Sequence, residues 1–143
     1  MRLLTTMLTF VLVGWGGGAS SETLFSCGSS EGWSRYPENS FISEEHAGWS
    51  EDAVSDGSIA LTWDGVGADI LVKDVAGMMS SRSEGAEVTV LAVDEPFVTV
   101  LVQYPKGSIE LYTFDSERRT VHWSQHKFGV MIDKAASFFA NCN

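Results

Sequence analysis

The feature that most constrains the fold of this chain is a change of hydrophobic period at Ser58. From there to His126, apolar and polar residues tend to alternate in six short runs rich in Val, Ile, Leu, Thr and aromatic residues. Alternation of this kind predicts β-strands, because successive side chains of a strand point to opposite faces. The runs are Ser58–Trp63, Asp69–Lys73, Ala86–Val93, Phe97–Tyr104, Ser108–Phe114 and Arg119–His126. They predict a mainly β fold: an antiparallel meander of about six strands over residues 58–126, forming a curled sheet or a small barrel.

Turn residues separate the runs and set their register. Between Tyr104 and Ser108 the sequence is Pro-Lys-Gly, in which Pro105 fixes the first turn residue and Gly107 takes the left-handed position of a three-residue hairpin loop. Tyr104 should therefore lie opposite Ser108. Extending this register gives one face that we interpret as core and an opposite face of mixed character. The predicted pairs are Leu101 with Leu111 and Gln103 with Ile109 on the first face, and Val100 with Tyr112 and Val102 with Glu110 on the second.

The mixed face holds a candidate site. If Phe114 pairs with Thr120 across the next turn, His122 lies beside Tyr112 and close to Glu110. A carboxylate, a phenol and an imidazole in one place suit a small-ligand site or the acid–base group of a small hydrolase or isomerase. The same residue types also occur together on the solvated side of any half-exposed sheet, so we expect no catalytic residue and no enzymatic activity.

The segments on either side of the meander have other patterns. Residues 21–57 predict an irregular covering segment, in which Trp33, Tyr36 and Trp49 stand among Gly, Ser and Glu. These rings either cover the second apolar face of the strand Phe97–Tyr104 or stack on a ligand in a barrel mouth.

The C-terminal segment predicts a short helix over residues 132–141. Asp133 can cap it, and four apolar side chains then follow at the spacing of one helix face. These side chains are Ala135, Phe138, Phe139 and Cys142. The second cysteine should therefore lie on the buried side of this helix.

The N-terminal residues 1–20 have the pattern of a secretory signal peptide. Arg2 precedes the apolar stretch Leu3–Val13, and a tail of small residues follows, with cleavage expected after Ala19 or Ser20. The rest of the chain, residues 21–143, is then one exported domain, secreted or periplasmic. Its two cysteines, Cys27 and Cys142, are most simply interpreted as one disulfide in an oxidising compartment.

Charge restricts the partners. The chain has 19 acidic residues against 9 Lys and Arg, a formal charge of −10, which disfavours nucleic acid and anionic membrane surfaces. No membrane span is expected after removal of the signal peptide, and the oligomeric state stays open. A metal site is not expected either, because His122 and His126 on one strand lie roughly 13 Å apart. We expect no cofactor.

Together these patterns favour an exported, acidic, non-enzymatic binding module. Its partner would be a basic extracellular or periplasmic protein, as for an inhibitor-type domain, since a strongly acidic domain is steered towards a cationic partner. The alternative is a small-ligand-binding barrel or a small hydrolase or isomerase that uses the face of Glu110, Tyr112 and His122. A deep pocket lined by these residues would favour the alternative.

Overall fold

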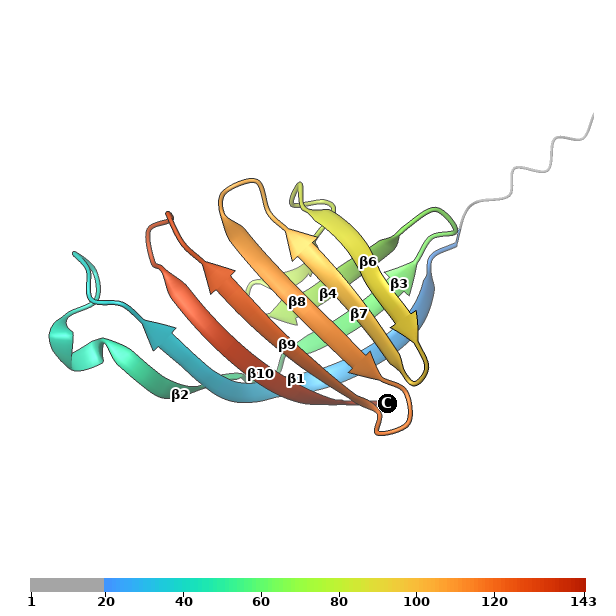
Figure 1. Cartoon of the computed structure of the whole chain (residues 1–143), viewed down its shortest axis with the longest axis horizontal. Helices are drawn as coiled ribbons and strands as arrows, with labels where there is room; N and C mark the ends of the chain where they lie inside the picture. The colour runs from blue at the N-terminus through green and yellow to red at the C-terminus, as the bar shows by residue number, and fades with distance from the viewer. Residues whose placement is uncertain (1–19) are drawn as a thin grey trace, which may run out of the picture.

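A long first strand, β1 (Glu22–Tyr36), is the centre of a curled antiparallel sheet in the computed structural model, which describes residues 20–143 (Figure 1). One side of β1 pairs with the last strand, β10. Its other side pairs with β3 through its first residues and with β2 through its last. The remaining strands follow outward in the order β3-β4-β5 on one side and β10-β9-β8-β7-β6 on the other. The predicted signal peptide, apart from Ser20, lies outside the described residues.

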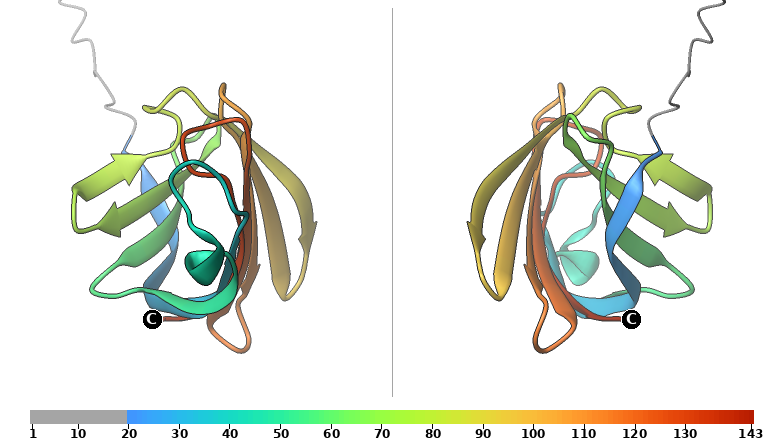
Figure 2. Two further views of the ribbon diagram at one scale, coloured as in Figure 1. Left: turned by 90° about the vertical axis from the view of Figure 1, so that its left-hand side faces the viewer. Right: turned by 90° about the vertical axis from the view of Figure 1, so that its right-hand side faces the viewer.

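The sheet curls into a half-barrel of ten strands within the described part of the chain (Figures 1 and 2). The path of paired strands ends at β5 and β6, β2 pairs with β1 alone, and β6 approaches β4 without pairing with it. The strands after β1 are β2 (Gly48–Val54), β3 (Ser58–Trp63), β4 (Ala68–Asp74), β5 (Gly77–Ser80), β6 (Glu87–Asp94), β7 (Phe97–Gln103), β8 (Ser108–Asp115), β9 (Thr120–Lys127) and β10 (Lys134–Cys142).

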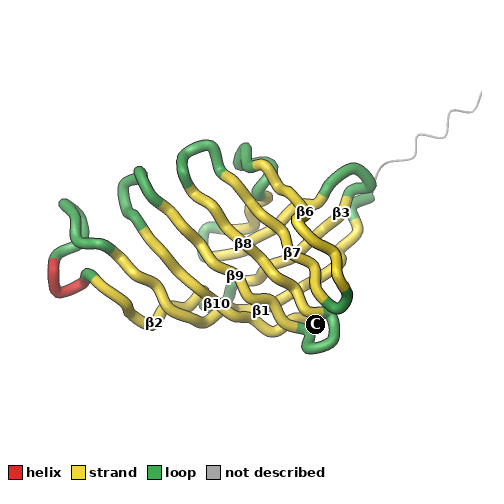
Figure 3. The backbone as a smooth tube through the Cα atoms, in the orientation of Figure 1, coloured by secondary structure: helices red, strands yellow, loops and turns green. Residues whose placement is uncertain are grey.

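The mainly β prediction is confirmed, but the count of about six strands is wrong. The six predicted runs correspond to β3, β4 and β6 to β9. The segment 21–57, predicted to be irregular, instead contributes β1 and β2, with the short 3₁₀ helix η1 (Glu44–His46) between them (Figure 3). Gly and Ser residues hid the alternation there. No helix among residues 20–143 is long and apolar enough to cross a membrane.

The predicted helix over residues 132–141 is also wrong, because this segment forms β10. The segment that fits the spacing of one helix face fits a period-two strand pattern equally well. As a strand, β10 gains backbone partners on both sides, from β1 and from β9. Such tertiary pairing overrides a weak local preference for helix. The residues that β10 buries are Ala136, Phe138, Ala140 and Cys142.

The hairpin between β7 and β8 has the predicted register. The Tyr104 N–H donates to the Ser108 carbonyl oxygen at 2.9 Å, and Gly107 has φ +78°. The assignment of the core face, however, was wrong. Val100 and Tyr112 are buried at 0% and 1% exposure, while Leu111 on the other face is 38% exposed. The curl places the mixed face on the inside, where its aromatic rings meet the opposite wall.

The hairpin between β8 and β9 differs from the prediction by one residue. Asp115 pairs with Thr120, so Tyr112 lies opposite Trp123 rather than His122. The carboxylate of Asp115 accepts hydrogen bonds from the backbone N–H groups of Glu117 and Arg118, which fixes a four-residue turn. A shift of one residue moves every side chain of a strand to the other face.

The predicted disulfide between Cys27 and Cys142 is confirmed. The two residues are direct neighbours on β1 and β10, and both face the inside of the half-barrel. Close by, the Phe25 and Phe114 rings pack 4.9 Å apart and join the two walls. A structural disulfide of this kind points to an oxidising, extracellular-type environment.

Candidate functional site

The inside of the half-barrel is filled near the disulfide and hollow at the other end. A cavity of about 620 Å³ lies there, bordered by strands of both walls. Its apolar and aromatic lining comes from Val54, Val72, Met79, Tyr104, Pro105, Tyr112 and Trp123. Its polar and charged lining comes from Ser81, Gln125, Asp74, Glu84, Glu110, Lys106, Lys127 and Lys134.

Glu110 is the most buried charged residue of this lining, with 7% of its surface exposed. Its carboxylate accepts a hydrogen bond from the Tyr112 hydroxyl at 2.8 Å on one oxygen and from the Gln125 amide at 2.6 Å on the other. Burial, together with the negative charge of Glu110, raises the pKa of Tyr112 well above its ordinary value. The phenol therefore stays protonated and remains a donor.

An aromatic stack stands beside this network. The Trp123 ring lies between Tyr112, at 5.6 Å between centroids, and Phe138, at 4.5 Å, with nearly parallel planes. The indole N–H of Trp123 donates to the Ser30 hydroxyl at 3.1 Å. The face of the indole is thus fixed by stacking and its edge by a hydrogen bond, which sets the orientation of Trp123 beside Glu110.

A second carboxylate on the concave side has its own cation. Asp52 on β2 accepts hydrogen bonds from the Lys134 ammonium at 2.9 Å and from the Ser34 hydroxyl at 2.6 Å. Burial alone would raise the pKa of Asp52, but these hydrogen bonds outweigh it and hold the pKa below its ordinary value. The same ammonium lies over the Tyr36 and Phe138 rings, 5.5 and 5.2 Å from their centroids.

The connection between β5 and β6 closes the seam of the half-barrel beside the cavity. The Ser81 N–H donates to the Ile70 carbonyl oxygen at 2.9 Å, and the Ser81 and Tyr104 hydroxyls share a hydrogen bond of 3.0 Å. Burial and the charge of Glu110 raise the pKa of Tyr104. The cavity therefore has two neutral phenols near one carboxylate.

The structure divides the site residues expected from the sequence between two faces. Glu110 and Tyr112 lie in the cavity, and Tyr36 reaches its edge through Lys134 and Asp52. Residues that pair directly across strands share a face, which places the other candidates on the convex side. These are Trp33, His122 and Trp49.

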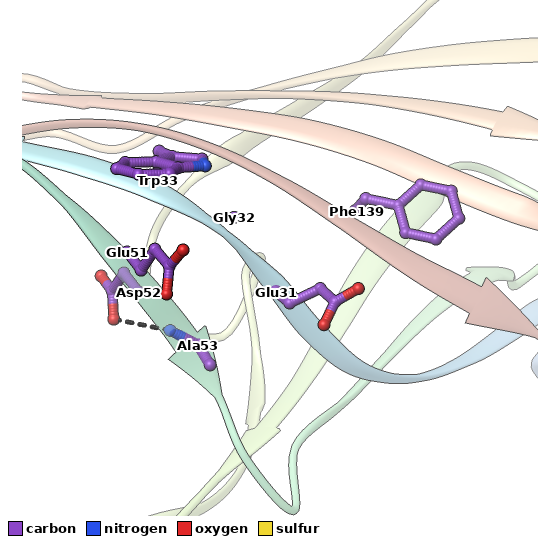
Figure 4. A pocket seen from close by; sticks show the side chains of 7 residues that line it. All are labelled: Glu31, Gly32, Trp33, Glu51, Asp52, Ala53 and Phe139. Atoms are coloured by element: carbon purple, nitrogen blue, oxygen red, sulfur yellow. Dashed lines mark hydrogen bonds between the residues drawn. The ribbon is translucent and has the colours of Figure 1, made fainter.

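The convex side has a shallow hollow of its own, shown in Figure 4. Trp33, Glu31 and Glu51 border it together with Phe139, whose ring meets His122 edge-on at 5.0 Å. Trp33 and Trp49 are 51% and 62% exposed, so they do not cover the core. The curl of the sheet, and not these two rings, covers the concave face.

Sequence reasoning missed the residues that complete the cavity. Trp123 and Gln125 face inward only in the true register of β9, and the four-residue turn that fixes this register was the signal that could have revealed them. Asp52 and Lys134 belong to strands that were expected to be irregular or helical.

Among residues 20–143, no group of three or more His, Cys, Asp or Glu side chains is arranged to hold a metal ion. Comparison of the chain with protein-family models, with curated proteins and with solved structures finds no match. The strand order and the cavity define the class of this protein as a curled antiparallel half-barrel with a hollow, partly charged interior.

Proposed function

We propose that this protein is a small exported binding module that holds a low-molecular-weight ligand in its concave cavity. The observation that carries the proposal is the cavity itself, about 620 Å³ in volume, with the hydrogen-bonded carboxylate of Glu110 in its wall. Ligand pockets in proteins commonly enclose about 300–1,000 Å³. They combine apolar and aromatic walls with a few fixed polar groups, as this one does.

Binding without turnover fits the chemistry of the lining better than catalysis. Glu110 is held by two neutral donors, Tyr112 and Gln125. His122, which the alternative of a small hydrolase or isomerase would use with them, lies on the convex face next to Phe139. In the described part of the chain, the concave face thus offers recognition groups, and the His122 imidazole lies on the opposite face.

Binding of a fluorescent probe tests this proposal. N-phenyl-1-naphthylamine, which is uncharged at neutral pH and brightens in apolar sites, should bind the disulfide-bonded protein with one site. Val72→Trp adds a large side chain to the cavity lining on β4 and should abolish the signal. Leu71→Trp places the same side chain on the other face of β4 and should leave the probe bound.

The result that contradicts the proposal is specific. If both tryptophan variants melt like the parent and neither changes the probe titration, the probe binds elsewhere. If the parent does not bind the probe at all, the cavity is not a ligand site.

A second candidate function is recognition of a basic extracellular or periplasmic protein by the convex face. The observation in its favour is that Trp33 and Trp49, both more than half exposed, flank the carboxylate of Glu51 on neighbouring strands. Exposed tryptophans are frequent anchors of protein interfaces. Trp33→Ala and Trp49→Ala should then weaken capture of a basic partner while probe binding in the cavity persists.

A further inference from the structure

We propose that the cavity selects a ligand that carries a protonated amine on an apolar body, with the ammonium group against Glu110. This inference rests on the proposed ligand-binding function and names the class of ligand. Its basis is a comparison between two carboxylates of the concave side, Asp52 and Glu110.

Asp52 shows what a carboxylate on this face binds. It is paired with the Lys134 ammonium at 2.9 Å, and the aromatic rings of Tyr36 and Phe138 border that ammonium. A carboxylate and aromatic faces together stabilise an ammonium group in a site with little water. The protein thus contains one complete ammonium site made of its own residues.

Glu110 also lies among aromatic side chains, but its hydrogen-bond donors are neutral. It lies beside Tyr112 and near Trp123 and Tyr104, and it is less exposed than the Asp52 side chain. Among the described residues, no Lys, Arg or His nitrogen lies within 4.0 Å of its carboxylate. A buried carboxylate without a cation is costly, and a cationic ligand would remove this cost.

The carboxylate has capacity for further donors. An ionised carboxylate offers about four lone-pair sites, of which Tyr112 and Gln125 occupy two. Both neighbours are neutral, so they orient the oxygens without cancelling the charge. Glu110 lines the cavity, so a ligand ammonium inside it can meet the carboxylate.

The lysines of the lining do not reverse this preference. Lys134 is already bound to Asp52, and Lys106 is exposed, whereas Glu110 is buried. Lys127 is partly exposed and lies beyond 4.0 Å of Glu110. Of the lining residues that the structure describes, Glu110 is the one with a buried charge, so water screens it least, and its sign favours a cation.

Three ligands of similar shape and different charge test the inference. They are protonated 1-naphthylmethylamine, the neutral alcohol 1-naphthalenemethanol and the anion of 1-naphthaleneacetic acid, here called the acetate. Each is titrated against the protein at neutral pH by displacement of N-phenyl-1-naphthylamine. The amine should bind about tenfold or more tightly than the alcohol, because hydrogen bonds to charged groups are the stronger ones. The acetate should bind least.

Two variants locate the origin of this preference. Glu110→Gln keeps the shape and the hydrogen bonds, since the Gln125 amide can turn to match it, and should bring the amine down to the affinity of the alcohol. Glu87→Gln removes the same charge from exposed β6 and should leave the preference unchanged. If Glu110→Gln does not fold, intermolecular NOEs from the amine methylene to the Tyr112 ring in the parent protein replace it.

The outcomes separate the inference from the proposed function. Equal affinity of the amine and the alcohol, or tightest binding of the acetate, overturns the inference while probe binding in the cavity stands. Loss of the amine preference in both glutamine variants also overturns it, because the effect then comes from net charge. Absence of probe binding in the parent protein overturns the proposed function itself.

Discussion

The indole N–H of Trp123 donates to the hydroxyl of Ser30 at 3.1 Å, and this bond joins β9 to β1 across the intervening strand β10. It is a long-range contact between residues 93 positions apart in the chain. Ser30 is 3% exposed, so the bond is shielded from water. The consequence is that the aromatic wall of the cavity is tied to the strand that organises the whole sheet.

Removal of the Ser30 hydroxyl should lower the free energy of unfolding while the protein still folds. Ser30→Ala leaves a shielded indole N–H without its acceptor, which costs about 1–3 kcal/mol. Denaturant unfolding measures this loss. Ser137→Ala, an exposed serine on β10, is the matched control and should change the free energy of unfolding by less than about 0.5 kcal/mol. Equal effects of the two variants would show that the Ser30 bond contributes nothing.

The assignment of the core face is tested on neighbouring residues of β7. Val100 is fully buried on the concave side, whereas Leu101 is partly exposed on the convex side. Val100→Asp should destabilise the protein by several kcal/mol, on the order of 3–5, because it buries a charge without a partner. Leu101→Asp should cost about 1 kcal/mol. The comparison is made by thermal and denaturant unfolding, and a reversed order would place the core on the other face.

Predictability from the sequence was uneven along the chain for physical reasons. The hairpin of β7 and β8 could be predicted to the residue, because Pro105 and Gly107 determine its turn. The next hairpin could not, because its register depends on side-chain hydrogen bonds of Asp115 within the turn and on Arg119 at φ +55°. That single difference moved His122 out of the expected site and brought Trp123 into it.

The structures of β1 and β10 were harder to predict, because each strand depends on the other for its backbone partners. β1 and β10 are each other's main partners although they lie at opposite ends of the domain. Neither segment shows a strand pattern that is clear by itself, since β1 has several Gly and Ser residues and β10 also fits a helix spacing. The cysteines were the local signal that linked them, because Cys27 and Cys142 predicted the disulfide without any knowledge of the strands.

Reduction of this disulfide should lower stability strongly. The bond closes a loop with a sequence separation of 115, for which loop-closure entropy gives about 4–5 kcal/mol. Urea unfolding with and without reductant should show a difference of this order, and Cys27→Ala with Cys142→Ala should behave like the reduced protein. Alkylation without reductant, followed by mass measurement, should find neither residue labelled. Two labelled thiols would contradict the disulfide.

The loss of folding stability at low pH should depend partly on Asp64. Its carboxylate accepts hydrogen bonds from the Gly67 and Val66 N–H groups and from Arg82, which lower its pKa from 3.8 to about 2. Because the folded-state pKa is the lower one, the stabilisation is present above about pH 4 and is lost as the pH falls towards 2. In Asp64→Asn, the difference in unfolding midpoint from the parent should shrink over this range. Glu87→Gln should show no such convergence, and a constant deficit in Asp64→Asn would contradict the linkage.

The close approach of β1 and β10 should depend on the absence of a side chain at Gly32. A Cβ atom there would clash with the Ser137 carbonyl oxygen and lie 2.8 Å from the Phe138 Cα, both of which belong to the backbone of β10. β1 cannot move aside freely, because at Gly32 it pairs with β2 on one side and with β10 on the other.

Gly32→Ala should therefore cost about 3 kcal/mol, the upper part of the range for overpacking, since backbone rather than a flexible side chain has to shift. Gly28 on the same strand is the matched control, because a Cβ there meets only the Asn141 carbonyl oxygen, at 3.9 Å. Gly28→Ala should be neutral or stabilise by about 0.4–1 kcal/mol through the unfolded chain. Denaturant unfolding of both variants decides the point. Equal stability of the two would mean that β1 and β10 are farther apart at Gly32 than this structure places them, and the curl that forms the cavity would need to be redrawn.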